Sequence, residues 1–152
     1  MSDTLKRTKE WFTTARPTSA PNTFSVQFGV HCEEVAETLE AIEPLDEQTG
    51  KLMDEARASL RKLSDALKSG QALIVHDDIA RTSLLDGLCD TIVTSVGCAH
   101  ALGMDIVGAM GEVNSSNFSK FEAGAPVFKE NGKIGKGKEY RPPNLRPFII
   151  KK

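Results

Sequence analysis

The sequence predicts an all-α fold, a helical bundle of about five helices with a short C-terminal hairpin and an irregular tail. Apolar residues recur at alternating steps of three and four positions, which is the spacing of one helical face. No run resembles a buried parallel strand, and only 6% of the 152 residues are aromatic, which suits a leucine- and alanine-rich helical protein. We expect a chain of this length to form one domain, residues 1–152.

Periodicity, caps and helix breakers place five helices along the chain. They cover residues 3–15, 23–43, 47–68, 77–102 and 105–118. The second helix carries an apolar stripe that we expect to face the core, made of Phe28, Cys32, Val35, Leu39 and Ile42. Asn22 or Thr23 suits the N-cap of this helix, and Gly103 suits the C-terminus of the fourth.

After Gly124 the pattern becomes irregular. Asn131-Gly132 lies between apolar residues, which is typical of a hairpin turn, and several glycines and prolines follow. Residues 129–152 hold eight basic and two acidic side chains, a charge of +6, so residues 1–128 carry −8. We therefore treat residues 125–152 as a basic hairpin and tail. The acidic body would repel a phosphate backbone and no reader motif is present, so we do not expect nucleic-acid binding.

The cysteines and the hydropathy pattern indicate the compartment. Cys32, Cys89 and Cys98 have no C-x-x-C spacing and an odd count, so we expect neither a zinc site nor a disulfide framework. The N-terminus has no apolar signal region, and the uncharged stretch 91–104 is too short to span a bilayer. We therefore expect a soluble, cytoplasmic protein without a membrane partner.

The fourth predicted helix contains two unusual carboxylates. Between Thr82 and Met104 the only formally charged residues are Asp86 and Asp90, one helical turn apart. The apolar residues around them predict a buried helix. Removing a carboxylate from water costs several kcal/mol unless a cation or hydrogen bonds compensate, so the pair indicates a bound partner.

The second predicted helix carries Glu33, Glu34 and Glu37, opposite its apolar stripe. A solvated glutamate face explains this cluster when the helix is considered alone. If this face packs against Asp86 and Asp90, four carboxylates converge, and such a cluster requires bound cations. All-oxygen ligands suit Mg²⁺ or Mn²⁺. A di-iron bundle usually has Glu-x-x-His on two helices, and this sequence has none.

In order, these segments resemble the MazG-like, all-alpha nucleoside triphosphate pyrophosphatases, in particular the phage and bacterial branch. Glu34-Val-Ala-Glu37 resembles the first half of their acidic signature, and the segment 85–105 around Asp86 and Asp90 resembles the second. The runs 112–120 and 131–145 resemble the last helix and the ending of that branch. One departure is that the family usually has Glu-x-x-Asp, whereas Gly stands at position 87 here and the two acids are four apart.

The resemblance implies Mg²⁺-dependent hydrolysis of a (deoxy)nucleoside triphosphate to the monophosphate and pyrophosphate, with dGTP, dCTP or dUTP as candidates. Glu34, Glu37, Asp86 and Asp90 would hold two or three Mg²⁺ or Mn²⁺ ions, and Glu33 would be the base for the attacking water. Substrate contacts would come from Asn117, Lys120, Lys133, Lys136, Lys138 and Tyr140. Trp11, Phe24 or Phe28 would either stack on the base or pack in the core.

The resemblance also implies a homo-oligomer, a dimer or a tetramer, in the cytoplasm of a bacterium or a phage-infected host. Two alternatives remain open from the sequence. One is phosphoribosyl-ATP pyrophosphohydrolase activity. The other is a non-catalytic helical interaction protein whose acidic faces are only solvated.

Overall fold

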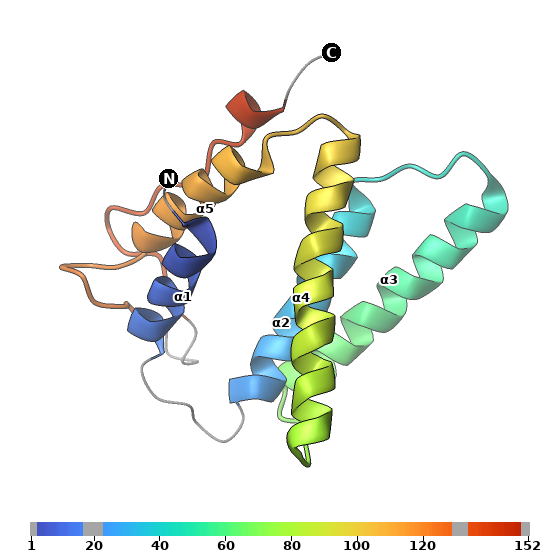
Figure 1. Cartoon of the computed structure of the whole chain (residues 1–152), viewed down its shortest axis with the longest axis horizontal. Helices are drawn as coiled ribbons and strands as arrows, with labels where there is room; N and C mark the ends of the chain where they lie inside the picture. Colours follow the sequence, from blue (N-terminus) through green and yellow to red (C-terminus); the bar gives the residue numbers. More distant parts are fainter. Residues whose placement is uncertain (1–2, 17–22, 129–133, 150–152) are drawn as a thin grey trace. The chain divides into compact units, whose positions relative to one another are not determined.

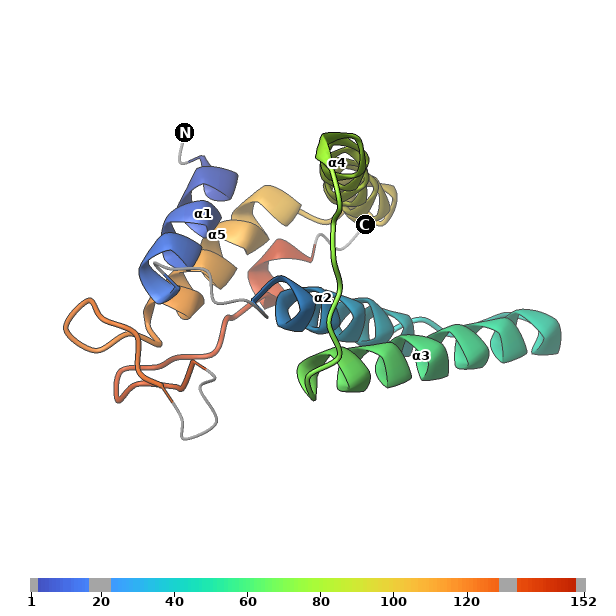
Figure 2. The same ribbon diagram turned by 90° about the horizontal axis from the view of Figure 1, so that it is seen from below.

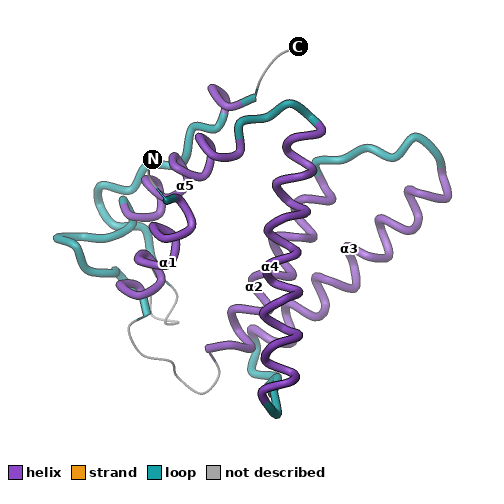
Figure 3. The backbone as a smooth tube through the Cα atoms, in the orientation of Figure 1, coloured by secondary structure: helices purple, strands orange, loops and turns teal. Residues whose placement is uncertain are grey.

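The computed structural model describes residues 3–16, 23–128 and 134–149, and the regular secondary structure of these residues is helical. They form α1 (Thr4–Ala15), α2 (Thr23–Glu40), α3 (Glu47–Lys68), α4 (Asp78–Ala101), α5 (Ile106–Phe118) and the 3₁₀ helix η1 (Arg146–Phe148) (Figure 1). No strand occurs within these ranges (Figure 3). The all-α prediction with five helices is confirmed, and each helix boundary lies within three residues of its predicted position.

Aspartate N-caps explain where four of these helices begin. Each cap side chain accepts a hydrogen bond from a backbone N–H three residues further on, at 2.8–3.1 Å. The capping residues are Asp3 for α1, Asp46 for α3, Asp77 for α4 and Asp105 for α5. An N-cap of this kind contributes about 1 kcal/mol to helix stability, so these starts are set by local sequence.

Contacts between Cα atoms divide the chain into two compact units. One consists of Thr18–His76 and contains α2 and α3. The other consists of Met1–Pro17 and Asp77–Lys152 and contains α1, α4, α5 and η1. The single domain expected for residues 1–152 stays a prediction, and each unit is described separately.

In the first unit, α2 and α3 form an antiparallel helical hairpin, seen side by side in Figure 2. The buried face of α2 consists of small residues: Ser25, Gly29, Cys32 and Ala36. Ser64 and Leu67 are the buried residues of α3. Small side chains at steps of three and four let two helix backbones approach closely.

The prediction that the apolar stripe of α2 faces the core is therefore wrong. Of its five residues only Cys32 is buried, whereas Val35 is 37% exposed and Ile42 is 53% exposed. The small-residue face lies roughly 70° around the helix from the centre of that stripe, at 100° per residue. Close backbone packing at Gly29 decided which face is buried, in preference to the larger apolar side chains.

The approach at Gly29 leaves no room for a side chain. A Cβ atom at this position would lie 3.0 Å from Leu67 Cβ and 3.1 Å from the backbone oxygen of Ser64. The Ser64 oxygen belongs to the backbone and Leu67 Cβ is bonded directly to it, so α3 itself would have to move. Gly97, exposed on α4, has no heavy atom of the described chain within 4 Å of such a Cβ.

In the second unit, α1 packs on α5 and on the residues directly after it through aromatic and polar contacts. The ring of Trp11 stacks on Phe121 with centroids 5.9 Å apart and an interplanar angle of 6°. Asn114 is 1% exposed, and its amide accepts from Thr8 Oγ1 at 3.0 Å and donates to the Thr4 backbone oxygen at 2.9 Å. Because both polar ends of Asn114 are paired, its burial is tolerated.

The chain after α5 turns back along that helix. Gly137 N–H donates to the Lys120 backbone oxygen at 3.1 Å, and a Cβ at Gly137 would lie 2.8 Å from that oxygen. Within the described residues, this part of the chain forms two isolated antiparallel bridges, Glu122 with Ala125 and Phe128 with Ile134. The predicted turn at Asn131-Gly132 lies outside the described residues.

The prediction that α4 is a buried helix is wrong for this chain. None of its residues is buried, and all its large apolar side chains except the half-buried Leu84 are 38–79% exposed, from Leu88 to Ile79. No single described helix is long and apolar enough to cross a membrane; α4 and α5 meet the length and composition criterion only as a pair bent by 118°.

Replacing Gly29 by Val should lower the free energy of unfolding by about 1–3 kcal/mol, because the new side chain overpacks the α2–α3 contact. Urea unfolding of the full chain, followed by far-UV circular dichroism, measures this change. Gly97→Ala is the matched control and should raise stability by about 0.5–1 kcal/mol, since Ala is the better helix former and meets no neighbour. Equal stability of Gly29→Val and wild type would contradict the close packing.

Candidate functional site

The three glutamates of the acidic cluster on α2 differ in their exposure to solvent. Glu34 and Glu37 are exposed, whereas Glu33 is half-buried and faces α3. Lys68 Nζ donates to Glu33 Oε1 at 2.8 Å, and the Lys68 side chain is only 15% exposed. The candidate base Glu33 is thus paired with a mostly covered ammonium group.

A small cavity of about 110 Å³ opens beside these carboxylates, between α2 and α3. Glu33, Glu37, Arg61, Ser64 and Asp65 line it. Every lining residue belongs to the unit Thr18–His76. The cavity is therefore a feature of the helical hairpin itself.

Two basic side chains of α3 lie next to this cavity. Arg61 Nη2 donates to Glu40 Oε1 in an exposed ion pair. Lys68 contacts Asp65 at 3.9 Å in addition to Glu33. Sequence analysis did not single out these residues, because the helical period of α3 gives no sign of which turn faces the glutamates of α2.

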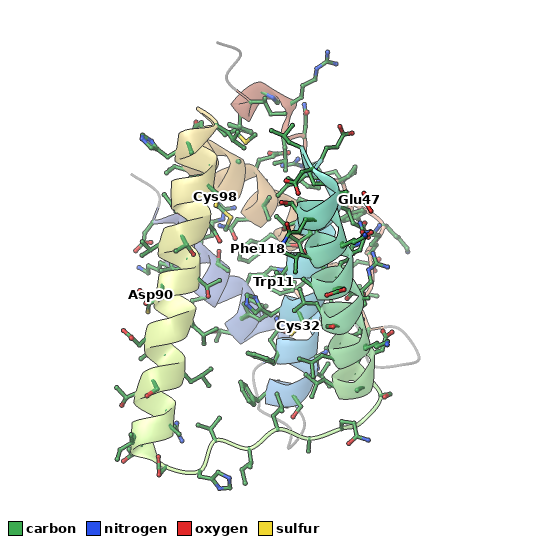
Figure 4. The ribbon with its side chains drawn as sticks, turned by 90° about the vertical axis from the view of Figure 1, so that its right-hand side faces the viewer. Trp11, Cys32, Glu47, Asp90, Cys98 and Phe118 are labelled. Atoms are coloured by element: carbon green, nitrogen blue, oxygen red, sulfur yellow. The ribbon has the colours of Figure 1, made fainter. Side chains whose placement is uncertain are left out.

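The second carboxylate pair lies on α4. Asp86 and Asp90 are both exposed and share one side of the helix at i,i+4, and Figure 4 labels Asp90 on this helix. They belong to a different compact unit from Glu34 and Glu37. Glu34 and Glu37 thus form one pair on α2, and Asp86 and Asp90 form another on α4, each within its own unit.

The donor chemistry of these pairs suits a hard divalent cation, since every ligand atom is a carboxylate oxygen that solvent reaches. Among the residues described, no three His, Cys, Asp or Glu side chains are close enough together to hold a metal ion. Each pair alone offers two carboxylates, so a complete metal site needs ligands from more than one helix.

Asn117 and Lys120, predicted to contact substrate, meet at the C-terminal end of α5. Lys120 Nζ donates to Asn117 Oδ1 at 2.8 Å and lies 5.7 Å from the centroid of the Trp11 ring. Trp11 Nε1 donates to the Asn117 backbone oxygen at 2.9 Å. The two predicted residues are brought together, and both also take part in the packing of α1 on α5.

The predicted tail residues have separate environments. Lys136 is exposed, and its Nζ lies 4.6 Å above the ring centroid of Tyr140, a cation–π contact. The Lys138 backbone N–H donates to Glu122 Oε1 at 2.9 Å. Lys133 lies outside the described residues.

The aromatic side chains considered for base stacking also have partners within the chain. Trp11 stacks on Phe121, as described above, and is half-buried. Phe24, 37% exposed, contacts Phe28 with ring centroids 5.9 Å apart. Phe24 is the most exposed of the three and the one whose ring is most accessible to a ligand.

An ion pair that the sequence did not reveal fastens the tail to α5. Arg141 Nη1 donates to Glu112 Oε1 at 2.6 Å, and Arg141 Nη2 donates to Ser115 Oγ at 2.7 Å. The Asn144 backbone N–H adds a bond to Glu112 Oε1 at 3.1 Å. The hydrogen bond from Arg141, and then that from Asn144, hold the pKa of Glu112 below its ordinary value of 4.5.

Comparison of the chain with models of protein families, with curated proteins and with solved structures gives no significant match. The resemblance to the MazG-like superfamily therefore stays a prediction that rests on the order and spacing of the motifs.

The pair between Glu112 and Arg141 should make the stability of its unit pH-dependent. Because the pKa of Glu112 is lowered in the folded chain, its contribution is present above pH 4.5 and is lost as the pH falls through the lowered pKa. Glu112→Gln should be less stable than wild type at pH 7 and should lose less stability on acidification. Urea midpoints from pH 3 to 7, followed by fluorescence of Trp11, the single tryptophan, measure this difference.

Glu139→Gln serves as the control for this experiment, since Glu139 lies in the same tail and is exposed. It should follow the wild-type pH profile. Identical profiles for Glu112→Gln and wild type would rule out the ion pair as the fastening of the tail.

Proposed function

We propose that the protein is a metal-dependent nucleoside triphosphate pyrophosphohydrolase of the MazG-like, all-alpha type. It would convert a (deoxy)nucleoside triphosphate into the monophosphate and pyrophosphate. The observation that supports this proposal best is the pair of exposed carboxylates, Glu34 and Glu37, one turn apart on α2. A second exposed pair, Asp86 and Asp90, lies on α4, a helix that otherwise has few charges.

In this proposal Glu34, Glu37, Asp86 and Asp90 hold two or three Mg²⁺ or Mn²⁺ ions. When bound, such ions supply charge neutralisation at the phosphates and a more acidic water molecule. Glu33 lies one residue from the ligand pair, and its Oε1 accepts a hydrogen bond from Lys68 Nζ at 2.8 Å. In this proposal Glu33 accepts the proton of the water that attacks the α-phosphorus.

The polar end of α5 and the tail are the proposed contacts for the rest of the substrate. Asn117 and Lys120 offer an amide and an ammonium group side by side, 2.8 Å apart. Lys136, Lys138 and Tyr140 of the described tail would add cationic and hydroxyl groups near the phosphates or the sugar. The candidate substrates are dGTP, dCTP and dUTP.

Glu37→Gln and Asp90→Asn should each lower kcat by about 100-fold or more, since each removes a charged ligand worth several kcal/mol in the transition state. The assay incubates the purified chain with Mg²⁺ or Mn²⁺ and each common NTP and dNTP, including dUTP, and separates the products by chromatography. Glu55→Gln, an exposed glutamate of α3 that does not line the cavity, is the matched control and should keep wild-type activity.

Other outcomes of this assay favour the alternatives. Turnover of phosphoribosyl-ATP alone would favour phosphoribosyl-ATP pyrophosphohydrolase activity. If no substrate is hydrolysed and titration calorimetry detects no Mg²⁺ binding, the enzymatic proposal is wrong and a helical interaction protein remains.

We also propose that the chain forms a homo-oligomer in which α4 contributes apolar surface. Five apolar side chains of α4 are 38–66% exposed: Leu85, Leu88, Ile92, Val93 and Val96. Their removal from water is favourable by about 25 cal/mol per Å², and a second copy of the helix would provide the cover.

The double substitution Val93→Lys, Val96→Lys should shift the particle mass toward that of the 16.5 kDa monomer, because two charges would have to be buried in the interface. Light scattering coupled to size-exclusion chromatography measures the mass. Thr82→Lys, at an exposed position near the start of α4, should leave the assembly unchanged. A monomeric wild type would contradict the proposal.

A further inference from the structure

The ion pair between Lys68 and Glu33 joins the two helices of the hairpin. Lys68 Nζ donates to Glu33 Oε1 at 2.8 Å, and the Lys68 side chain is only 15% exposed. By contrast, the pair of Lys51 with Glu47 lies within α3, and its side chains are 70% and 84% exposed. Lysine is rarely so covered unless it is paired, so Lys68 has a fixed place in the contact of α2 with α3.

The apolar stem of Lys68 lies over Gly29, where α2 approaches α3. A Cβ atom at Gly29 would lie 3.4 Å from Lys68 Cγ, so the methylene chain of the lysine covers this glycine. Gly29 and Glu33 are four residues apart and share one side of α2. The ammonium group at the end of the stem therefore reaches the carboxylate one turn further along the helix.

Two further electrostatic contacts favour a cation at the position of Lys68. This residue lies in the last turn of α3, where the helix dipole favours positive charge. Asp65, one turn earlier, has a carboxylate oxygen 3.9 Å from Lys68 Nζ. Packing of the stem and attraction of the ammonium group therefore act together to hold this side chain in place.

Glu33 stays accessible while it is held. Its side chain is 42% exposed, so water reaches the carboxylate. It directly precedes Glu34, which is exposed on the same helix as Glu37. A general base is more effective when its orientation is set before the reaction, because less side-chain entropy is then lost in the transition state. The hydrogen bond from Lys68 provides such a fixed orientation.

We propose that Lys68 is a positioning residue, which holds the carboxylate of the candidate base Glu33 in one orientation beside Glu34 and Glu37. This inference rests on the proposed function and deepens it. Lys68 contacts neither the substrate nor a metal ion in this proposal and acts only through Glu33. Its stem, packed on Gly29, links the packing of the hairpin to the orientation of the base.

Steady-state kinetics of the full chain, with Mg²⁺ and the nucleotide that wild type hydrolyses, test this role. Lys68→Met keeps an apolar stem and removes the ammonium group, so it should lower kcat by about ten-fold and leave KM unchanged. Lys68→Arg keeps the charge and should recover part of this loss. Lys51→Met is the matched control, because it also breaks an ion pair of α3, and it should have wild-type kinetics.

A double-mutant cycle distinguishes positioning of the base from general support of the fold. In a Glu33→Gln background, Lys68→Met should not lower kcat further, because Lys68 acts only through the Glu33 carboxylate. An equal loss of kcat in both backgrounds would contradict the positioning role.

Urea unfolding of the same four proteins gives a readout that does not depend on activity. Lys68→Met should lower the urea midpoint more in the wild-type background than in the Glu33→Gln background, because the two side chains interact. Equal shifts of the midpoint in both backgrounds would overturn the proposal.

The outcomes separate this inference from the proposed function. If wild type hydrolyses a nucleotide and Lys68→Met has the wild-type kcat, the positioning role is wrong and the proposed function stands. If wild type hydrolyses no nucleotide with Mg²⁺ or Mn²⁺, the proposed function is wrong, and the positioning role is wrong with it. A loss of kcat that disappears in the Glu33→Gln background supports both.

Discussion

The close contact of α2 with α3 at Gly29 is the constraint on which the acidic site depends. With no side chain at this position, the backbone of α2 comes within van der Waals distance of Leu67 and Ser64. This approach brings Glu33 to Lys68. It also brings together the residues of α2 and α3 that line the small cavity beside Glu37. A wider spacing would separate the charges of the two helices and would admit solvent to the cavity, so the chemistry of the site follows from a packing requirement.

The other unit is organised by polar groups that α5 presents to its neighbours. Asn114 is buried because it has partners in α1 at both ends of its amide. Glu112 is paired with Arg141, which fastens the tail to the same helix. Asn117 and Lys120 combine this structural role with the substrate contacts proposed for them. A change at either residue would therefore disturb the α1–α5 packing as well as the contacts that we propose with a nucleotide.

The charge distribution connects the two proposals about function. Carboxylates of α2 and basic groups of α3 lie within one helical hairpin, in which Lys68 is paired with the candidate base Glu33. Asp86 and Asp90 provide a second acidic pair on α4, and the exposed apolar side chains of this helix form the interface that we propose with another copy. Metal binding, nucleotide hydrolysis and oligomer formation can thus be measured separately in the same chain.

The sequence alone determined the all-α class and the helix boundaries, because N-caps such as Asp77 and helical periodicity are local properties. It also identified the two carboxylate pairs, since their spacing fixes a common side of each helix. Only the tertiary structure decided that α2 buries Gly29 and Ala36 rather than its larger apolar residues. It alone showed the ion pairs of Glu33 with Lys68, 35 residues apart, and of Glu112 with Arg141, 29 apart. Such pairs depend on how helix backbones pack, and helix packing is set by fit over many residues, which no local pattern contains.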